Sequence, residues 1–217
     1  MPRLLFKLAL SIALLLSATS LAATVLGTAQ PPNPILRGFT EDCEDRPQPC
    51  WNGIMPGQTD VATAQNRLES KGYKLDHAES RILYFSNRAE GNSIAGTCSN
   101  IRLSFEGNTK LLANITLVGC DGMILGNLWH IGFPEKIMQP LDLYIKLGEY
   151  YTAITSQSDA NSTPRELSPN TKIDGLDIGS SVKTVNLAID LVGQNWHGFV
   201  PHWRYCQLEP NFGDCAQ

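Results

Sequence analysis

Two groups of residues in this sequence could carry chemistry: six cysteines, and a close pair of histidines near the C-terminus. The cysteines fall into three neighbouring pairs, namely Cys43 with Cys50, Cys98 with Cys120, and Cys206 with Cys215. Six cysteines can pair in many ways, and spacing alone does not select one. No Cys-x-x-Cys motif typical of a zinc site occurs. We therefore expect disulfide bonds, and the clustering favours three local bridges.

The histidine pair, His197 and His202, is the strongest candidate for a metal site. A spacing of five does not place both rings on one helix face, and Pro201 between them excludes a regular helix. We therefore favour aromatic packing of this segment and predict no metal. A secreted, metal-dependent hydrolase using His197 and His202 is the alternative. Zinc bound in stoichiometric amount and lost on changing His197 to alanine would establish it.

Two further motifs are weaker. The segment 179–181, Gly-Ser-Ser, lacks the second glycine of a Gly-x-Ser-x-Gly nucleophile motif and has no base beside it. The segment 174–177, Asp-Gly-Leu-Asp, lacks the alternating acidic residues and final glutamate of a calcium loop, so we expect a turn there. The sequence thus predicts no catalytic residues and no cofactor.

The N-terminus predicts the compartment. Residues 8–29 carry no charge and follow Arg3 and Lys7, as in an export signal. Cleavage after Ala22 or Ala29 would release the protein, whereas retention would anchor it in the membrane, because a charge-free run of this length can span a bilayer. Both outcomes place the remaining chain outside the cytoplasm. We expect a secreted or membrane-anchored protein with oxidised cysteines.

The charge of the remaining chain limits its partners. Without Arg3 and Lys7 it carries 15 basic and 21 acidic side chains, a formal net charge of −6. This excess of acid argues against binding to nucleic acid or anionic lipid. We expect a neutral or basic partner, such as an envelope or secreted protein, with membrane contact limited to the N-terminal segment.

The middle cysteine pair sits at the ends of a predicted β-hairpin. Residues 99–105 and 111–118 alternate in the manner of strands, and residues 106–110 have a turn composition. If Leu103 faces Ile115, the same register places Cys98 opposite Cys120, within bonding reach. Registers shifted by two residues also place the apolar faces of the two strands together. The cysteine pair therefore selects one register among several and does not confirm it independently.

The elements repeat in order along the chain. Thr59 is the predicted N-cap of a helix that ends near Lys71, and a strand at 81–85 follows before the hairpin. A short helix at 122–131 and strands at 143–145, 150–155 and 182–191 form a second series. We predict an α+β fold, an antiparallel sheet with helices packed on one side and stapled by disulfides, with two tandem α-β repeats as its alternative organisation. Trp51 is expected in the core.

The chain is therefore expected to divide into five segments: a signal peptide or anchor at 1–29, a Pro-rich linker at 30–49, α-β units at 50–120 and 121–205, and a disulfide-closed tail at 206–217.

The segments 49–59, 131–137 and 196–199 resemble an uncharacterised family of exported or membrane-anchored bacterial proteins, many of them from filamentous Chloroflexota. That family has no established activity to carry over. More distantly, the turn and helix at Gly57 and Thr59, followed by antiparallel strands, are similar to outer-membrane-assembly lipoproteins and tandem-repeat β-lactamase inhibitor proteins. Both of these act by binding other proteins. This chain differs from the lipoproteins because it has no acylation cysteine, so the resemblance does not imply an outer-membrane lipid anchor. The leader, the paired cysteines and the absence of a convergent reactive set predict a binding or protein-interaction module at the cell envelope, and a purely structural spacer is the remaining alternative.

Overall fold

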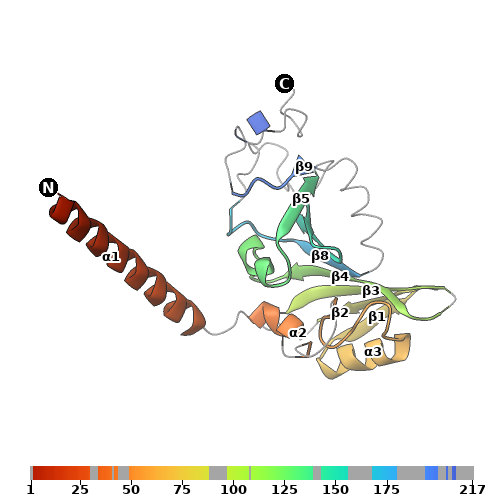
Figure 1. The fold of residues 1–217 in the computed structure, drawn as a ribbon. Coiled ribbons are helices and arrows are strands. Elements are labelled where there is room, and N and C mark those ends of the chain that lie inside the picture. Colours follow the sequence, from red (N-terminus) through yellow and green to blue (C-terminus); the bar gives the residue numbers. More distant parts are fainter. Residues whose placement is uncertain are drawn as a thin grey trace. The chain divides into compact units, whose positions relative to one another are not determined.

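The chain divides into two compact units, residues 1–32 and 33–217, in a computed structural model. The structure describes residues 2–29, 34–40, 42–43, 49–87, 97–107, 109–138, 143–155, 168–179, 194–199, 204 and 207–208. Figure 1 shows their elements.

The N-terminal unit is one helix, α1 (Pro2–Ala29). Its described side chains, residues 6–22, are all exposed to solvent. Within the described part of the chain, no helix combines the length and apolar content of a membrane span. The export leader at residues 1–29 stays a prediction.

The second unit is built on one antiparallel sheet, so the sheet-dominated part of the predicted α+β fold is confirmed. Among the described residues nine strands pair in the order β1-β2-β3-β4-β8-β7-β6-β5-β9. Their bounds are β1 Lys74–Ala78, β2 Ile82–Ser86, β3 Cys98–Phe105, β4 Leu112–Cys120, β5 Pro134–Met138, β6 Leu143–Leu147, β7 Tyr151–Thr155, β8 Gly175–Gly179 and β9 Gln194–Asn195.

One face of the sheet holds the core. The cross-strand rows on this face consist of aliphatic and aromatic side chains, because alternate residues of each strand point the same way. One row is Leu83, Leu103, Ile115 and Ile178, and the next is Phe85, Ile101, Leu117 and Leu176. All eight side chains are buried.

Helix α3 (Val61–Ser70) adds Ala64 and Leu68 to the same core. The predicted N-cap was one residue early: Asp60, not Thr59, caps the helix, and its carboxylate accepts a hydrogen bond from the Thr63 backbone N–H at 2.9 Å. This bond lowers the pKa of Asp60.

The segment before α3 is folded as well. It contains the turn η1 (Pro34–Leu36) and the short helix α2 (Arg37–Thr40), and Phe39 is buried against Tyr151 at a centroid distance of 6.3 Å. The predicted linker at 30–49 therefore contributes to the core from Leu36 onward. Trp51 is buried as expected, and it packs edge-on against Tyr73.

Among the described residues, two disulfide bonds staple this unit: Cys43–Cys50 and Cys98–Cys120. The second confirms the predicted hairpin register, since Cys98 lies opposite Cys120 and Leu103 opposite Ile115. The predicted Cys206–Cys215 bridge lies outside the described residues.

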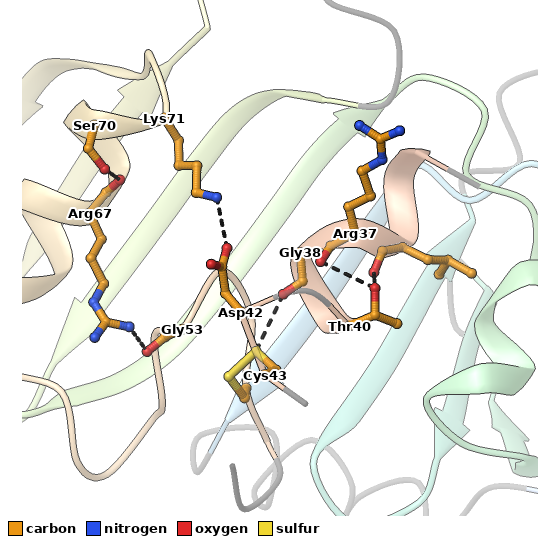
Figure 2. A network of polar contacts seen from close by, with 11 residues as sticks. Arg37, Gly38, Thr40, Asp42, Cys43, Gly53, Arg67, Ser70 and Lys71 are labelled. Carbon is orange, nitrogen blue, oxygen red and sulfur yellow. Dashed lines mark hydrogen bonds and ion pairs between the residues drawn. A yellow bond between two sulfur atoms is a disulfide. The ribbon is translucent and has the colours of Figure 1, made fainter. Parts of the chain in front are cut away.

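Polar contacts hold residues on both sides of the Cys43–Cys50 bridge against the helix α3 and its C-cap (Figure 2). Lys71 Nζ lies 2.8 Å from Asp42 Oδ2, and the Arg67 guanidinium donates to the Gly53 carbonyl oxygen. The Cys43 sulfur lies 3.4 Å from the Gly38 carbonyl oxygen; because a disulfide sulfur carries no proton, this is a close contact and not a donated hydrogen bond.

Several predicted elements differ from the structure. The 174–177 segment is not a turn, because residues 175–177 lie in β8 at the centre of the sheet, where Leu176 is buried. The expected helix at 122–131 is a shorter 3-10 helix, η2 (Leu125–His130). Strand β1 was not predicted. The expected strand at 182–191 falls outside the described residues.

Candidate functional site

Four aromatic side chains form a cluster on the surface of the second unit: Trp129, Phe133, Trp196 and Phe199. Trp129 stacks on Phe199 with ring centroids 5.4 Å apart and an interplanar angle of 23°. Phe133 lies 6.3 Å from Trp129, and Trp196 meets Phe199 edge-on at 5.5 Å. We call these four residues the aromatic cluster.

The aromatic cluster is partly open to solvent. Phe133 is 73% exposed and Trp129 is 41% exposed, whereas Trp196 and Phe199 are half-buried and pack against the core. The inner pair therefore anchors the outer pair. Soluble proteins seldom leave grouped aromatic rings exposed unless the surface has a binding role.

Backbone hydrogen bonds bring the distant halves of the cluster together. Strand β9 pairs with β5, with Asn195 opposite Lys136 and Gln194 opposite Ile137. The Trp196 backbone N–H then donates to the Glu135 carbonyl oxygen at 2.9 Å. This pairing fixes the Trp196 backbone beside the strand that begins just after Phe133.

Gly132 sets the position of Phe133. A Cβ atom at residue 132 would lie 3.1 Å from the Leu147 backbone carbonyl, so the close approach of the two backbones favours glycine. The Gly132 backbone N–H donates to the Leu128 carbonyl oxygen at 3.2 Å, which ends η2 and directs the chain into β5.

An ion pair lies on the strands beside the cluster. Lys146 Nζ is 3.4 Å from Glu135 Oε2, and the lysine side chain is only 12% exposed while the glutamate is half exposed. The opposite charges balance, so the surface next to the aromatic rings gains no net charge from this pair.

Of the two histidines proposed as metal ligands, the structure describes one. His197 is half-buried in the segment that carries Trp196 and Phe199, and His202 lies outside the described residues. In the described part of the chain, no three histidine, cysteine, aspartate or glutamate side chains are grouped to hold a metal ion. The interpretation of the pair as a metal site stays untested.

The sequence predicted aromatic packing for the 196–199 segment, but it did not single out Trp129 or Phe133. Their spacing of four residues around Gly132 was the available signal. It is a weak one, because the same spacing serves a buried helix face equally well.

The fold and the bridges define the class of this protein as a disulfide-stapled α+β domain dominated by an antiparallel sheet. Comparison with known proteins finds no matching family model, no matching curated protein and no matching solved structure.

Proposed function

We propose that this protein is an extracytoplasmic binding module that docks a partner protein on the aromatic cluster. The observation that carries the proposal is the exposure of Phe133 and Trp129 in an aromatic cluster whose inner members, Trp196 and Phe199, pack against the core. Tryptophan and other aromatic residues dominate the energetics of protein interfaces, because they bury a large apolar area at a low entropic cost. A structural spacer has no need of such a surface.

The partner is a protein with an apolar or aromatic patch and a neutral or basic rim. The net charge of −6 outside the leader disfavours a strongly acidic partner at long range. At short range the Glu135–Lys146 pair leaves the surface beside the rings balanced, so apolar contact dominates there.

The oxidised cysteines support an extracytoplasmic location, since disulfide bonds persist in oxidising compartments. The charge-free segment 8–29 is the proposed export signal or anchor. N-terminal sequencing of the protein recovered from the envelope would distinguish a cleaved leader from a retained one.

The order of the elements supports a tandem repeat. Among the described elements, a helical element precedes four antiparallel strands in each half, α3 before β1 to β4 and η2 before β5 to β8. The two halves join at β4 and β8, which gives the sheet its mirrored strand order. We include in the proposal a relationship to tandem-repeat proteins that bind other proteins, with the turn and helix at Gly57 and Thr59 followed by antiparallel strands as its sequence basis.

Affinity capture tests the proposed docking surface. The tagged full-length protein would be incubated with intact envelope fractions in three forms: wild type, Phe133→Ser and Leu75→Ser. Leu75 is a matched control, because it is an exposed apolar residue on β1 at 37% exposure. We expect the wild type and the Leu75 variant to retain the same partner and the Phe133 variant to lose it. Equal retention by all three would contradict the proposal.

A further inference from the structure

A concave surface separate from the aromatic cluster lies on the sheet face opposite the core. It is a cavity of about 440 Å³ over strands β1 to β4, and its lining includes Asp76, His77, Tyr84, Arg102 and Thr116. Four of these side chains form a row that crosses the sheet, in which His77 is opposite Tyr84, Tyr84 opposite Arg102, and Arg102 opposite Thr116. None of them belongs to the aromatic cluster.

Arg102 supplies the positive charge of this cavity, and its guanidinium forms a hydrogen bond through one nitrogen. One guanidinium nitrogen donates to Thr116 Oγ1 at 3.2 Å. Thr116 is buried, and its hydroxyl oxygen also lies 3.4 Å from Asn114 Nδ2, which fixes the acceptor. Among the described residues, Arg102 forms no ion pair. Its remaining N–H groups are therefore oriented and available for an anionic ligand.

A stacked aromatic pair lines the same cavity as Arg102. The His77 and Tyr84 rings stack with centroids 4.1 Å apart and an interplanar angle of 11°. Tyr84 occupies the position directly opposite Arg102 on the neighbouring strand, so the ring and the guanidinium start from Cβ atoms about 5 Å apart. A ligand that places an anion on Arg102 can lay a ring against this stacked pair.

The surrounding carboxylates restrict the charge of the ligand. Asp76 lines the same cavity, where it accepts a hydrogen bond from Ser86 Oγ at 2.8 Å. Asp177 lies opposite Thr116 on β8, and its Oδ1 is buried without a hydrogen-bond partner. Each of these carboxylates repels a dianion such as a phosphate monoester more strongly than a monoanion, so a single carboxylate is favoured over a phosphate.

We propose that this cavity binds a monocarboxylate that carries an aromatic ring, with the carboxylate on Arg102 and the ring against Tyr84 and His77. The ligand is either a free aromatic acid or the C-terminal carboxylate of a peptide that ends in an aromatic residue. The site goes beyond the proposed function, because it shares no residue with the aromatic cluster.

Calorimetric titration of the full-length oxidised protein tests the site. The probes are 3-phenylpropionate and its neutral analogue 3-phenylpropanol, together with N-acetyl-alanyl-phenylalanine as the free acid and as the amide. We expect both acids to saturate and both neutral probes to bind at least about tenfold more weakly, because charged hydrogen bonds to Arg102 are lost. Tighter binding of the peptide acid assigns a chain terminus as the ligand, and tighter binding of 3-phenylpropionate assigns a free acid.

Arg102→Gln is the decisive variant, and Arg81→Gln is its matched control. Both arginines are exposed on the same half of the sheet, but Arg81 does not line this cavity. We expect Arg102→Gln to weaken both acids about tenfold or more and Arg81→Gln to leave them unchanged. Tyr84→Leu tests the ring contact separately and should weaken all four probes.

Three results would overturn the proposal. They are failure of both acids to saturate the wild type, equal binding of acids and neutral probes, and unchanged binding of the acids by an Arg102→Gln protein whose thermal unfolding matches the wild type. Partner capture on the aromatic cluster is tested with variants at Phe133 and Leu75, which do not line this cavity. The proposed docking surface and the proposed carboxylate site can therefore fail independently.

Discussion

Removing the Cys98–Cys120 bridge should cost more stability than removing Cys43–Cys50. The two bridges close loops of different size, with sequence separations of 22 and 7 residues. A crosslink stabilises a protein mainly by restricting the unfolded chain, and the restriction grows with the logarithm of the loop length. The loop-entropy relation gives about 3.4 kcal/mol for the longer loop and about 2.4 kcal/mol for the shorter one at 25 °C.

The comparison is matched, because all four sulfurs are buried. Cys98, Cys120, Cys43 and Cys50 are each at most 3% exposed, so replacing either pair with alanine removes similar buried volume. The cavity contribution therefore largely cancels between Cys98→Ala/Cys120→Ala and Cys43→Ala/Cys50→Ala. The remaining difference of about 1 kcal/mol comes from the loop lengths.

Urea unfolding under oxidising conditions measures both variants against the wild type. We expect the free energy of unfolding to fall in both, and to fall further when Cys98 and Cys120 are replaced. Equal losses, or a larger loss from the shorter loop, would contradict the dependence on loop length. Unchanged stability in both variants would show that the bridges do not constrain the chain.

Two further predictions concern a tyrosine and a glycine of the second unit. Burial raises the pKa of Tyr151 to about 12, against a backbone hydrogen bond with Cys50 that lowers it. The unfolded chain releases this proton near pH 10, whereas the folded protein holds it. Protonated Tyr151 therefore contributes its full share to the free energy of unfolding below about pH 10, and this share declines by about 2–3 kcal/mol as pH rises toward 12. Urea unfolding at about pH 9 and about pH 11 should show a smaller decline in Tyr151→Phe than in the wild type; equal declines would exclude this tyrosine as the cause. Gly179→Ala should destabilise by about 2–3 kcal/mol, because its Cβ would lie 2.5 Å from the Ala113 carbonyl oxygen at a φ of +132°. Gly148→Ala, at a φ of +66° in open space, should cost about 1 kcal/mol, and equal unfolding losses in the two variants would contradict the steric explanation.

The central hairpin could be predicted from the sequence because two independent signals agree there. Apolar residues alternate on both strands, and the cysteines select one register among those that match the faces. The structure has that register, with Ile101 opposite Leu117 and Cys98 opposite Cys120. A local pairing joined by a short turn depends on little outside the segment itself.

Neither β1 nor β8 could be predicted from the sequence, and the reasons are opposite. Every residue of β1 is exposed, so no buried side chain gives the alternation that marks a strand. Strand β8 is buried, but it begins and ends with glycine and follows Asp174, which is the composition of a turn. Its partners β4 and β7 supply the context: Gly179 is needed because the Ala113 backbone and Pro56 leave no space for a side chain.

The aromatic cluster depends on pairing between distant segments. Trp129 and Phe199 come together because β9 adds to β5, and two residues of strand carry no recognisable sequence pattern. Tertiary contacts of this kind decide which aromatic residues enter the core and which stay exposed. The sequence predicted aromatic packing near Trp196, but the exposed pair on its outer side required the structure.

The dissociation constant of the captured partner is the most direct test of docking on the aromatic cluster. Dissociation constants would be measured for the wild type, Phe133→Ser and Leu75→Ser with the same purified partner. We predict that Phe133→Ser weakens binding about 30-fold, equivalent to about 2 kcal/mol for an interface hot spot, while Leu75→Ser stays within about twofold. The same dissociation constant for all three proteins would show that the partner docks elsewhere.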